Sequence, residues 1–395
     1  MQTTCVLGKE LSRLGFGGMR FPLLEDGKTI DEARLAEMVD YAMAHGVNYF
    51  DTAYTYHDGR SEGALGRVLR RYPRESYCLA TKYPGHQPDD SYDPAATFQE
   101  QLNNCGVEYF DFYLLHNVNE STLGTYTDPR WGIVDYFVEQ KKLGRIRHLG
   151  FSCHGSADVI RTFLDYCDGA MEFCQIQLNY LDWTLQNARD KYALLEERGV
   201  PVFVMEPVRG GKLAKLDDSW EQKLKALRPG ESIPAWGFRY LQRLPGVAVI
   251  LSGMSNLEQV QDNVKTFSGG APLTEQEVEL LHEIAEALKD GVPCTACRYC
   301  CGDCPAGLDI PLLLSIYNDL RVAGEVVVTM RLEGLAPEVL PGACVGCGSC
   351  KQLCPQGIDV PAILAELDGM LKKMPKWADI CRERMAIIRQ ERQGG

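Results

Sequence analysis

Eight of the sixteen cysteines in this 395-residue sequence fall into two copies of the spacing C-x2-C-x2-C-x3-C-P. The first copy contains Cys294, Cys297, Cys300 and Cys304, and the second contains Cys344, Cys347, Cys350 and Cys354. In such a run three close thiolates hold one 4Fe–4S cluster, and the fourth, before proline, ligates the other cluster. The spacing therefore predicts two clusters, one on Cys294, Cys297, Cys300 and Cys354 and one on Cys344, Cys347, Cys350 and Cys304. Two four-cysteine zinc sites are the alternative, but these usually consist of separated C-x2-C pairs.

The two copies form an internal repeat that extends beyond the cysteines. Each is followed by a similar exit, Ala306–Pro311 and Gln356–Pro361, in which an Asp, a hydrophobic residue and a Pro come in succession. Asp at a cap and Pro in the first turn are typical of a helix start, so helices are predicted over Leu312–Leu320 and Ala362–Leu371. The linker between the motifs also has helical character. The region 286–371 therefore resembles the α-helical type of two-cluster ferredoxin.

Composition excludes several classes of partner. Acidic residues outnumber basic ones 54 to 41, the net charge is −13, and the sequence has no stretch rich in Lys and Arg. Nucleic acids and anionic membranes are therefore poor candidates. No window reaches about 18 consecutive apolar residues, and the N-terminus lacks a signal-peptide core, so we expect a cytoplasmic protein without a membrane segment. In that compartment sixteen cysteines indicate metal ligation and free thiols rather than disulfides.

The long N-terminal region must position any further chemistry. It alternates short β-rich runs with helix-period segments such as Asp31–Ala44 and Leu185–Glu197. Eight strands are predicted: Leu14–Met19, Val47–Thr52, Cys78–Lys82, Phe110–His116, His148–Ser152, Phe173–Leu178, Val202–Met205 and Val247–Ser252. This order predicts an α/β fold, a (β/α)8 TIM barrel over 1–285. The amphipathic helix Thr274–Lys289 leads to the cysteine region, and residues 372–395 are expected to form a helical tail.

Polar residues lie where the predicted strands end, which is where a barrel gathers its chemistry. Asp51-Thr52-Ala53 with Tyr56, Leu79–Lys82 and Tyr113–His116 resemble the motifs of the aldo-keto reductase family, and so does the opening Ser12–Gly18. The resemblance implies that Tyr56 protonates a substrate oxygen while hydride reaches carbon, with Lys82 and Asp51 tuning the tyrosine and His116 positioning the oxygen. An ammonium beside a phenol favours the phenolate, which makes the tyrosine a better acid.

The same resemblance implies a nicotinamide site. Positions that match dinucleotide contacts in relatives are Ser152, Gln175, Ser252, Gly253 and Asn263, and further expected contacts are Cys153, Met205 and Arg209. Two departures stand out. Met205-Glu206-Pro207 replaces the usual Tyr-Ser-Pro, and Gly253, Ser255 and Gln259 stand where basic residues usually hold a 2′-phosphate. NAD(P)H is the expected cofactor, with NADH or a flavin such as FMN as alternatives. For Arg209, a phosphate contact and a solvated turn remain equal alternatives.

The cofactors expected at the barrel and at the cysteine repeats differ in how they carry electrons. Nicotinamide delivers two electrons together, whereas a 4Fe–4S cluster passes them singly, and a flavin converts between the two modes. Our leading hypothesis is an oxidoreductase that acts on a small-molecule carbonyl, alcohol or activated double bond and exchanges electrons with a ferredoxin-like partner. The alternatives are an NAD(P)H-dependent carbonyl reductase with structural clusters, and a non-catalytic redox sensor or electron-carrier subunit.

Overall fold

The computed structural model describes residues 1–86, 92–289, 291–292, 294, 296–323 and 330–393. The chain forms two compact units, one made of Met1–Glu279 with Glu383–Gly395 and the other of Leu280–Arg382. Among the described helices, none combines the length and the apolar character needed to cross a bilayer.

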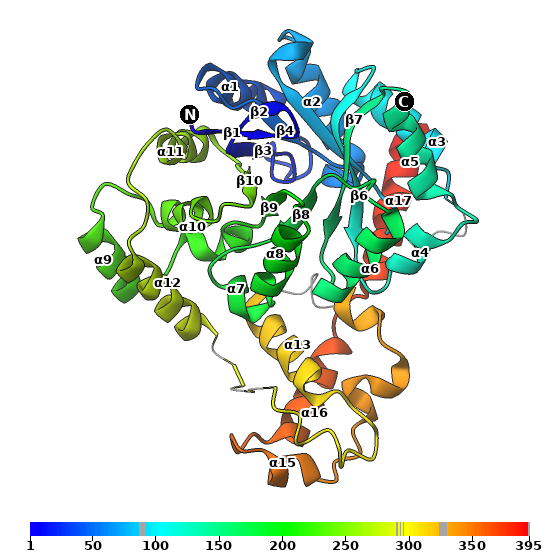
Figure 1. The fold of residues 1–395 in the computed structure, drawn as a ribbon, viewed down its shortest axis with the longest axis vertical. Coiled ribbons are helices and arrows are strands. Elements are labelled where there is room, and N and C mark those ends of the chain that lie inside the picture. The colour runs from blue at the N-terminus through cyan, green and yellow to red at the C-terminus, as the bar shows by residue number, and fades with distance from the viewer. Residues whose placement is uncertain (87–91, 290, 293, 295, 324–329, 394–395) are drawn as a thin grey trace. The chain divides into compact units, whose positions relative to one another are not determined.

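Eight parallel strands close into a barrel in the order β10-β3-β4-β5-β6-β7-β8-β9 (Figure 1). Their bounds are β3 Leu14–Gly17, β4 Tyr49–Asp51, β5 Cys78–Tyr83, β6 Phe110–Val118, β7 Ile146–Cys153, β8 Cys174–Gln177, β9 Val202–Met205 and β10 Val247–Gly253. All eight predicted strands are present, and the prediction of a (β/α)8 barrel is confirmed. Aromatic rings fill its interior. The ring centroid of Tyr49 lies 5.2 Å from that of Phe112 and 5.4 Å from that of Phe203, and the ring centroids of Phe203 and Phe173 are 4.7 Å apart. The interior is therefore a packed core rather than a pore.

Helices surround the barrel, and several of them begin at a side-chain cap. They are α1 Glu32–Ala44, α2 Ser61–Leu69, α3 Pro94–Cys105, α4 Leu123–Thr127, α5 Ile133–Lys142, α6 Ala157–Cys167, α7 Asp182–Leu185, α8 Ala188–Glu197, α9 Asp218–Leu227, α10 Ile233–Gln242 and α11 Leu257–Phe267. Asp31, Asp93 and Ser156 accept a backbone N–H of the first turn at α1, α3 and α6, as N-caps do. The helix predicted over Leu185–Glu197 is present as α8 but begins at Ala188, because Asn187 takes a left-handed φ of 50° and separates α7 from α8.

A hairpin that the sequence did not predict precedes the barrel. Strands β1 (Thr3–Val6) and β2 (Lys9–Ser12) pair in antiparallel fashion. Val6 and Leu11 are buried in one cluster with Tyr49 and other residues of the barrel interior. The hairpin therefore extends the barrel core.

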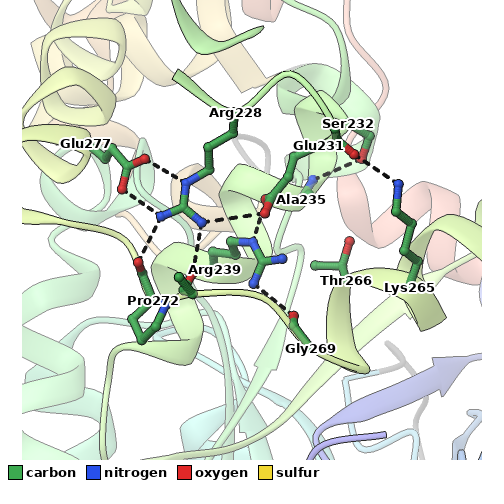
Figure 2. Close-up of polar contacts among 12 residues, drawn as sticks. Arg228, Glu231, Ser232, Ala235, Arg239, Lys265, Thr266, Gly269, Pro272 and Glu277 are labelled. Carbon is green, nitrogen blue, oxygen red and sulfur yellow. Dashed lines mark hydrogen bonds and ion pairs between the residues drawn. The ribbon is translucent and has the colours of Figure 1, made fainter. Parts of the chain in front are cut away.

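The chain leaves the barrel through an ion-pair network at the start of α12 (Glu275–Leu288). Figure 2 shows Arg228 reaching both Glu277 and Glu231, and Arg239 reaching Glu231 and the carbonyl of Gly269. Arg228 donates to the two Glu277 carboxylate oxygens at 2.6 and 2.7 Å, which is the bidentate geometry of a strong pair. This network fixes the first turn of α12 to the barrel.

The second unit contains a small helical core. Its elements include α13 Ile310–Ala323, α15 Ser349–Leu353, α16 Val360–Leu371 and the beginning of α17, Trp377–Gln393. The helices predicted over Leu312–Leu320 and Ala362–Leu371 are present as α13 and α16, and Asp309 and Asp359 accept backbone N–H groups at their starts. The last turns of α17 belong to the barrel unit, where buried Ile388 fills the space in which Gly59 would carry a Cβ.

Candidate active site and cysteine cavities

Three adjacent strands bring the four predicted catalytic residues together. Asp51 ends β4, Lys82 lies near the end of β5, and His116 lies near the end of β6. Strand register pairs Asp51 with Ala80 and Lys82 with Leu114, so the three side chains lie at the same end of the barrel. Tyr56 opens a short 3-10 turn just beyond β4. The strand ends thus assemble a cluster from residues far apart in sequence.

Lys82 is the centre of this cluster. Its Nζ donates to Asp51 Oδ1 at 2.5 Å, to the Thr52 carbonyl at 2.8 Å and to Tyr56 Oη at 3.3 Å. The Lys82 and Asp51 side chains are 0% and 3% exposed. Burial by itself lowers the pKa of Lys82, but the neighbouring Asp51 and Tyr56 outweigh burial and raise that pKa. The lysine is therefore held as an ammonium ion in contact with the tyrosine oxygen.

Tyr56 keeps its proton at neutral pH. Burial raises the pKa of Tyr56 above its usual value near 10, while the Lys82 ammonium acts in the opposite direction. The sequence argument named only the lowering by lysine, and burial is the larger effect in the structure. A protonated phenol with an ammonium ion 3.3 Å from its oxygen can give up a proton, because the cation stabilises the charge that develops.

His116 lies beside this tyrosine as a neutral imidazole. The two rings meet edge to face with centroids 6.0 Å apart. Burial, helped by the neighbouring His86 and Lys82, lowers the pKa of His116 well below its usual value near 6.5. Its buried Nδ1 has no hydrogen-bond partner among the described residues. A neutral imidazole at this place can orient a carbonyl oxygen without changing its charge.

His86 belongs to the same cluster but was missed at the sequence level. Its ring packs edge to face on His116 with centroids 4.7 Å apart, and burial lowers the pKa of His86 to about 3. Tyr126 Oη donates to the His116 carbonyl at 2.6 Å from another side. His86 follows β5 by three residues, so the rule that polar residues at strand ends gather in one place could have found it.

A cavity of about 470 Å³ lies beside β10 and the loop after β9. Three of the predicted cofactor contacts, Ser252, Gly253 and Asn263, line it, and Asn263 Nδ2 donates to Ser252 Oγ at 3.0 Å. Arg20 and Glu206 also line it, with Arg20 Nη2 and Glu206 Oε1 4.0 Å apart. Neither residue was predicted. Arg20 follows the glycines at the end of β3, and a cation after a glycine-rich turn was the signal that could have found it.

The other predicted cofactor contacts lie outside the lining of that cavity. Ser152 is buried and its Oγ accepts the Asn117 backbone N–H at 2.8 Å. Cys153 is buried, and burial raises the pKa of its thiol to about 12, so it stays a neutral thiol. Gln175 is buried at the end of β8, and its Oε1 has no hydrogen-bond partner in the part of the chain that the structure describes. A buried amide oxygen without a donor fits an N–H group of a ligand such as a carboxamide.

Met205 and Arg209 flank the loop after β9. Met205 is the last residue of the strand and is partly exposed. Arg209 is buried, and its Nη1 lies 3.3 Å from Asp182 Oδ1. Its neighbours Gly210 and Gly211, rather than Arg209 itself, line the cavity. The structure thus places the Arg209 side chain against Asp182.

Four cysteines from the two repeats converge in each of two cavities of the second unit. One is lined by Cys294, Cys297, Cys300 and Cys354, and the other by Cys344, Cys347, Cys350 and Cys304. The remaining lining is largely apolar: Leu314, Ile358 and Val360 in the first cavity, and Leu308, Ile310 and Leu364 in the second. Four thiols in an apolar setting are the donor set that an iron–sulfur cluster requires.

Comparisons with known proteins agree with this division. The model of the Aldo/keto reductase family matches residues 13–286, and the model of the 4Fe-4S dicluster domain matches residues 293–358. The NADH-specific methylglyoxal reductase of Escherichia coli (strain K12) is 26% identical over 290 residues, which cover 62% of this chain and 85% of that protein. The uncharacterized oxidoreductase YqkF of Bacillus subtilis (strain 168) is 25% identical over 302 residues, covering 69% of this chain and 92% of the relative.

Solved structures show the same barrel. The holo form of aldo-keto reductase AKR11C1 from Bacillus halodurans superposes with a TM-score of 0.58 at 26% identity, covering 73% of this chain and 97% of that one. The thermostable aldo-keto reductase Tm1743 superposes with a TM-score of 0.57 at 21% identity, which supports the fold.

Proposed function

Because the chain belongs to the aldo/keto reductase family and carries a 4Fe-4S dicluster domain, we propose that it is an iron–sulfur oxidoreductase with Tyr56 as proton donor. Its substrate is a small molecule with a carbonyl, alcohol or related group that gains or loses two electrons. The observation that carries this proposal is the contact of the buried Lys82 ammonium with both Asp51 and Tyr56.

The proposed chemistry follows from the geometry of these side chains. His116, held neutral by burial, orients the carbonyl oxygen towards Tyr56. Tyr56 gives its proton to that oxygen as hydride reaches the carbon, and the product is an alcohol. Lys82 stabilises the phenolate that remains, and Asp51 keeps Lys82 charged and in place.

Replacement of Tyr56 by Phe tests the proton donor. We expect Tyr56→Phe to lower kcat for carbonyl reduction by about 10²- to 10⁴-fold, the usual contribution of a general acid, with little change in cofactor binding. Tyr54→Phe is the matched control, because Tyr54 Oη donates instead to Glu100 at 2.9 Å. Full activity of Tyr56→Phe on a genuine substrate would remove the assignment.

We propose NADH as the hydride donor of the barrel. When bound, the reduced nicotinamide would supply a hydride, which carries two electrons. The residues that would hold it are Gln175, with its orphaned buried amide oxygen, together with Ser252, Gly253 and Asn263 along the 470 Å³ cavity. Ser152, Cys153, Met205 and Arg209 remain predicted contacts from the sequence. The preference for NADH rests on the cavity lining near Ser255, where Gln259 stands instead of a cation for a 2′-phosphate, and on Arg20, the cation of that lining, which faces Glu206 at 4.0 Å. The Escherichia coli relative is named NADH-specific.

A charge introduced at Gln259 tests this preference. Gln259 Oε1 accepts the Ser255 backbone N–H at 2.8 Å, so its side chain already points along the cavity rim. Gln259→Arg should raise kcat/KM with NADPH by about tenfold, the value of one charge-assisted hydrogen bond. Gln222→Arg, on the exposed side of α9, is the control for added charge. A wild-type preference for NADPH would contradict the proposal.

We further propose that the two cysteine cavities hold 4Fe–4S clusters that exchange single electrons with a ferredoxin-like partner in the cytoplasm. Cys294, Cys297, Cys300 and Cys354 would hold one cluster, and Cys344, Cys347, Cys350 and Cys304 the other. The crossing of the fourth cysteine between repeats supports this, since each cavity draws on both copies. A flavin is the group that would link one-electron and two-electron steps. Anaerobically purified protein without flavin absorbance would remove that link.

Structural clusters in an ordinary NAD(P)H-dependent carbonyl reductase are the second candidate. The closed barrel with its complete set of Asp51, Tyr56, Lys82 and His116 favours this candidate over a non-catalytic subunit. Cys347→Ser separates it from the first. Unchanged turnover with NADH would support structural clusters, and loss of turnover with a reduced viologen would support electron exchange through them.

A further inference from the structure

The two cysteine repeats share their cysteine spacing but carry different residues between the cysteines, and one of these differences places a charge beside a cavity. Arg298 follows the second cysteine of the first copy, and Gly348 occupies that place in the second copy. Both take a left-handed backbone, with φ of 65° at Arg298 and 81° at Gly348. Glycine adopts this conformation without strain, whereas other residues lose about 1 kcal/mol or more. Ala296 in the same loop also takes a left-handed φ, of 55°, so it is the side chain of Arg298 and not its backbone that distinguishes this position.

The side chain of Arg298 lies on one cysteine cavity and has no counterpart on the other. Arg298 lines the cavity formed by the first triple with Cys354. The second cavity has Gly348 and Val345 at the equivalent loop and is lined only by cysteines, apolar residues and glycine among the described residues. The fixed positive charge of a guanidinium thus faces one of the two cavities.

The two repeats share one further feature, the cap of the following helix, although they also differ at other positions such as Tyr299 and Ser349 or Asp303 and Leu353. Each repeat has an Asp that caps the following helix and pairs with a cation. Asp309 Oδ2 accepts from Arg298 Nη2 at 2.9 Å, and Asp359 Oδ2 accepts from Lys351 Nζ at 2.5 Å. Arg298 lines its cavity, whereas the second cavity's lining among the described residues does not include Lys351. Both pairs therefore serve the helix caps, and only one also places a cation at a cluster site.

We propose that Arg298 makes the two cluster sites unequal, by raising the reduction potential of the cluster on Cys294, Cys297, Cys300 and Cys354. This rests on the proposed function in one respect, that both cysteine sets hold 4Fe–4S clusters. Reduction adds one negative charge to a cluster, and a nearby cation stabilises the reduced form more than the oxidised form. An electron that enters the module comes to rest on the cluster beside Arg298.

Two contacts oppose the effect of the Arg298 charge on the difference between the two clusters, and both are weaker than that charge. Asp309 carries the opposite charge, but it is the arginine and not the aspartate that lines the cavity. The side chains of Arg298 and Asp309 are 60% and 39% exposed, so solvent reduces the influence of both. In the second copy, Cys347 Sγ and Ser349 Oγ lie 3.7 Å apart, and a hydroxyl beside a cluster sulfur also favours reduction. A neutral hydroxyl dipole at that distance contributes less than a full charge.

A redox titration of the full chain tests the proposal. The protein is prepared without oxygen, iron and sulfide are quantified, and the two midpoint potentials are followed by EPR. Arg298→Gln should lower one midpoint potential by roughly 59 mV, which corresponds to a tenfold change in a one-electron equilibrium. The other midpoint potential should stay in place. Arg298→Lys should retain most of the wild-type value, and Lys351→Gln should move neither midpoint by a comparable amount. Ser349→Ala should lower only the other midpoint, which assigns the two signals.

The reverse substitution gives a gain that a disturbed fold would not produce. A Cβ built on Gly348 meets no atom within 4 Å, and the first repeat shows that arginine can take this backbone. Gly348→Arg should raise the second midpoint and bring the two potentials together. Full iron and sulfide with midpoints unmoved by Arg298→Gln and by Gly348→Arg would overturn this inference and leave the proposed function intact. Protein without iron and sulfide would overturn both.

Discussion

The barrel site and the cysteine module reach their geometry in different ways. In the barrel, Asp51 and Lys82 are placed by the register of neighbouring strands, and Lys82 donates to three oxygens of the protein itself. In the module, six of the eight ligand candidates belong to the core: Cys300 and Cys350 are buried in its main cluster, Cys294, Cys304, Cys344 and Cys354 pack against it, and Cys297 and Cys347 are exposed. The barrel thus forms its site from contacts within the protein, whereas the cysteines of the module line two cavities. The comparison indicates that the barrel site is preorganised and that the module depends on what its cysteines bind.

Loss of iron should show the largest difference between the two regions. Cys300→Ser, or treatment of the protein with a chelator, should unfold the module while the barrel keeps its own melting temperature. Metal binding to structural sites is worth on the order of 10 kcal/mol, more than a small core supplies. Hydrogen exchange resolved along the chain measures this directly, through loss of protection in α13 and α16 alone.

Cys301→Ser is the matched control for that experiment. Cys301 is adjacent to Cys300 but lies off the repeat spacing and outside the lining of the cavity. It should leave protection in α13 and α16 unchanged. Equal protection in the presence and absence of iron would show that the module is as self-sufficient as the barrel, and the comparison would fail.

Removal of the buried cation is the corresponding test of the barrel. Lys82→Met leaves Asp51 as a buried carboxylate without its partner, which typically costs about 3 to 5 kcal/mol of unfolding free energy. The barrel should therefore melt at a lower temperature and lose carbonyl reduction. In the double variant Asp51→Asn with Lys82→Met, much of the stability should return while activity stays absent. A single variant Lys82→Met as stable as the wild type would show that the pair is not part of a preorganised core.

Sequence patterns were sufficient for what depends on periodicity and spacing. The barrel strands coincide with short β-rich runs between helix-period segments, and the position of Asp51, Lys82 and His116 at strand ends follows once the strands are placed. The spacing of the cysteines likewise predicts the two sets of four that line the two cavities, because the fourth cysteine of such a run belongs with the other triple. These features are local or are set by the chain order of a barrel.

Features that depend on one residue or on tertiary packing were missed. The β1–β2 hairpin has too few apolar residues to stand out, and it is held by the contacts of Val6 and Leu11 with the barrel core. The break at Asn187 depends on a single left-handed residue in an otherwise helical pattern. Arg20 and Glu206 come from loops after different strands, and only the folded barrel brings them to one cavity.

A smaller effect is expected where the chain leaves the barrel. The bidentate contact with Arg228 lowers the pKa of Glu277 to about 2 from its usual value of 4.5. A depressed pKa contributes stability that is present above pH 4.5 and is lost as pH falls towards 2. Glu277→Gln should cost about 1 kcal/mol at neutral pH, since the pair is partly open to solvent. Glu279→Gln, on the exposed side of the same helix, should cost nothing measurable, and equal unfolding free energies for the two variants would contradict this role of the network.

The smallest expected effect is that of pH on kcat/KM for carbonyl reduction at the barrel site. It is small because the side chains of the site are buried in fixed protonation states. Burial holds the pKa of His116 well below 6.5 and the pKa of Tyr56 above 10. In the proposed mechanism, carbonyl reduction requires neutral His116 and protonated Tyr56. Neutral His116 is lost only as pH falls below its lowered pKa, and protonated Tyr56 only as pH rises above its raised pKa. The rate kcat/KM for reduction should therefore vary by less than about twofold between pH 6 and 9, and should fall only on the alkaline side beyond this range. A steady-state pH profile measures this, and a limb centred near 6.5 would show that water reaches His116 and that burial does not fix the charge of the site.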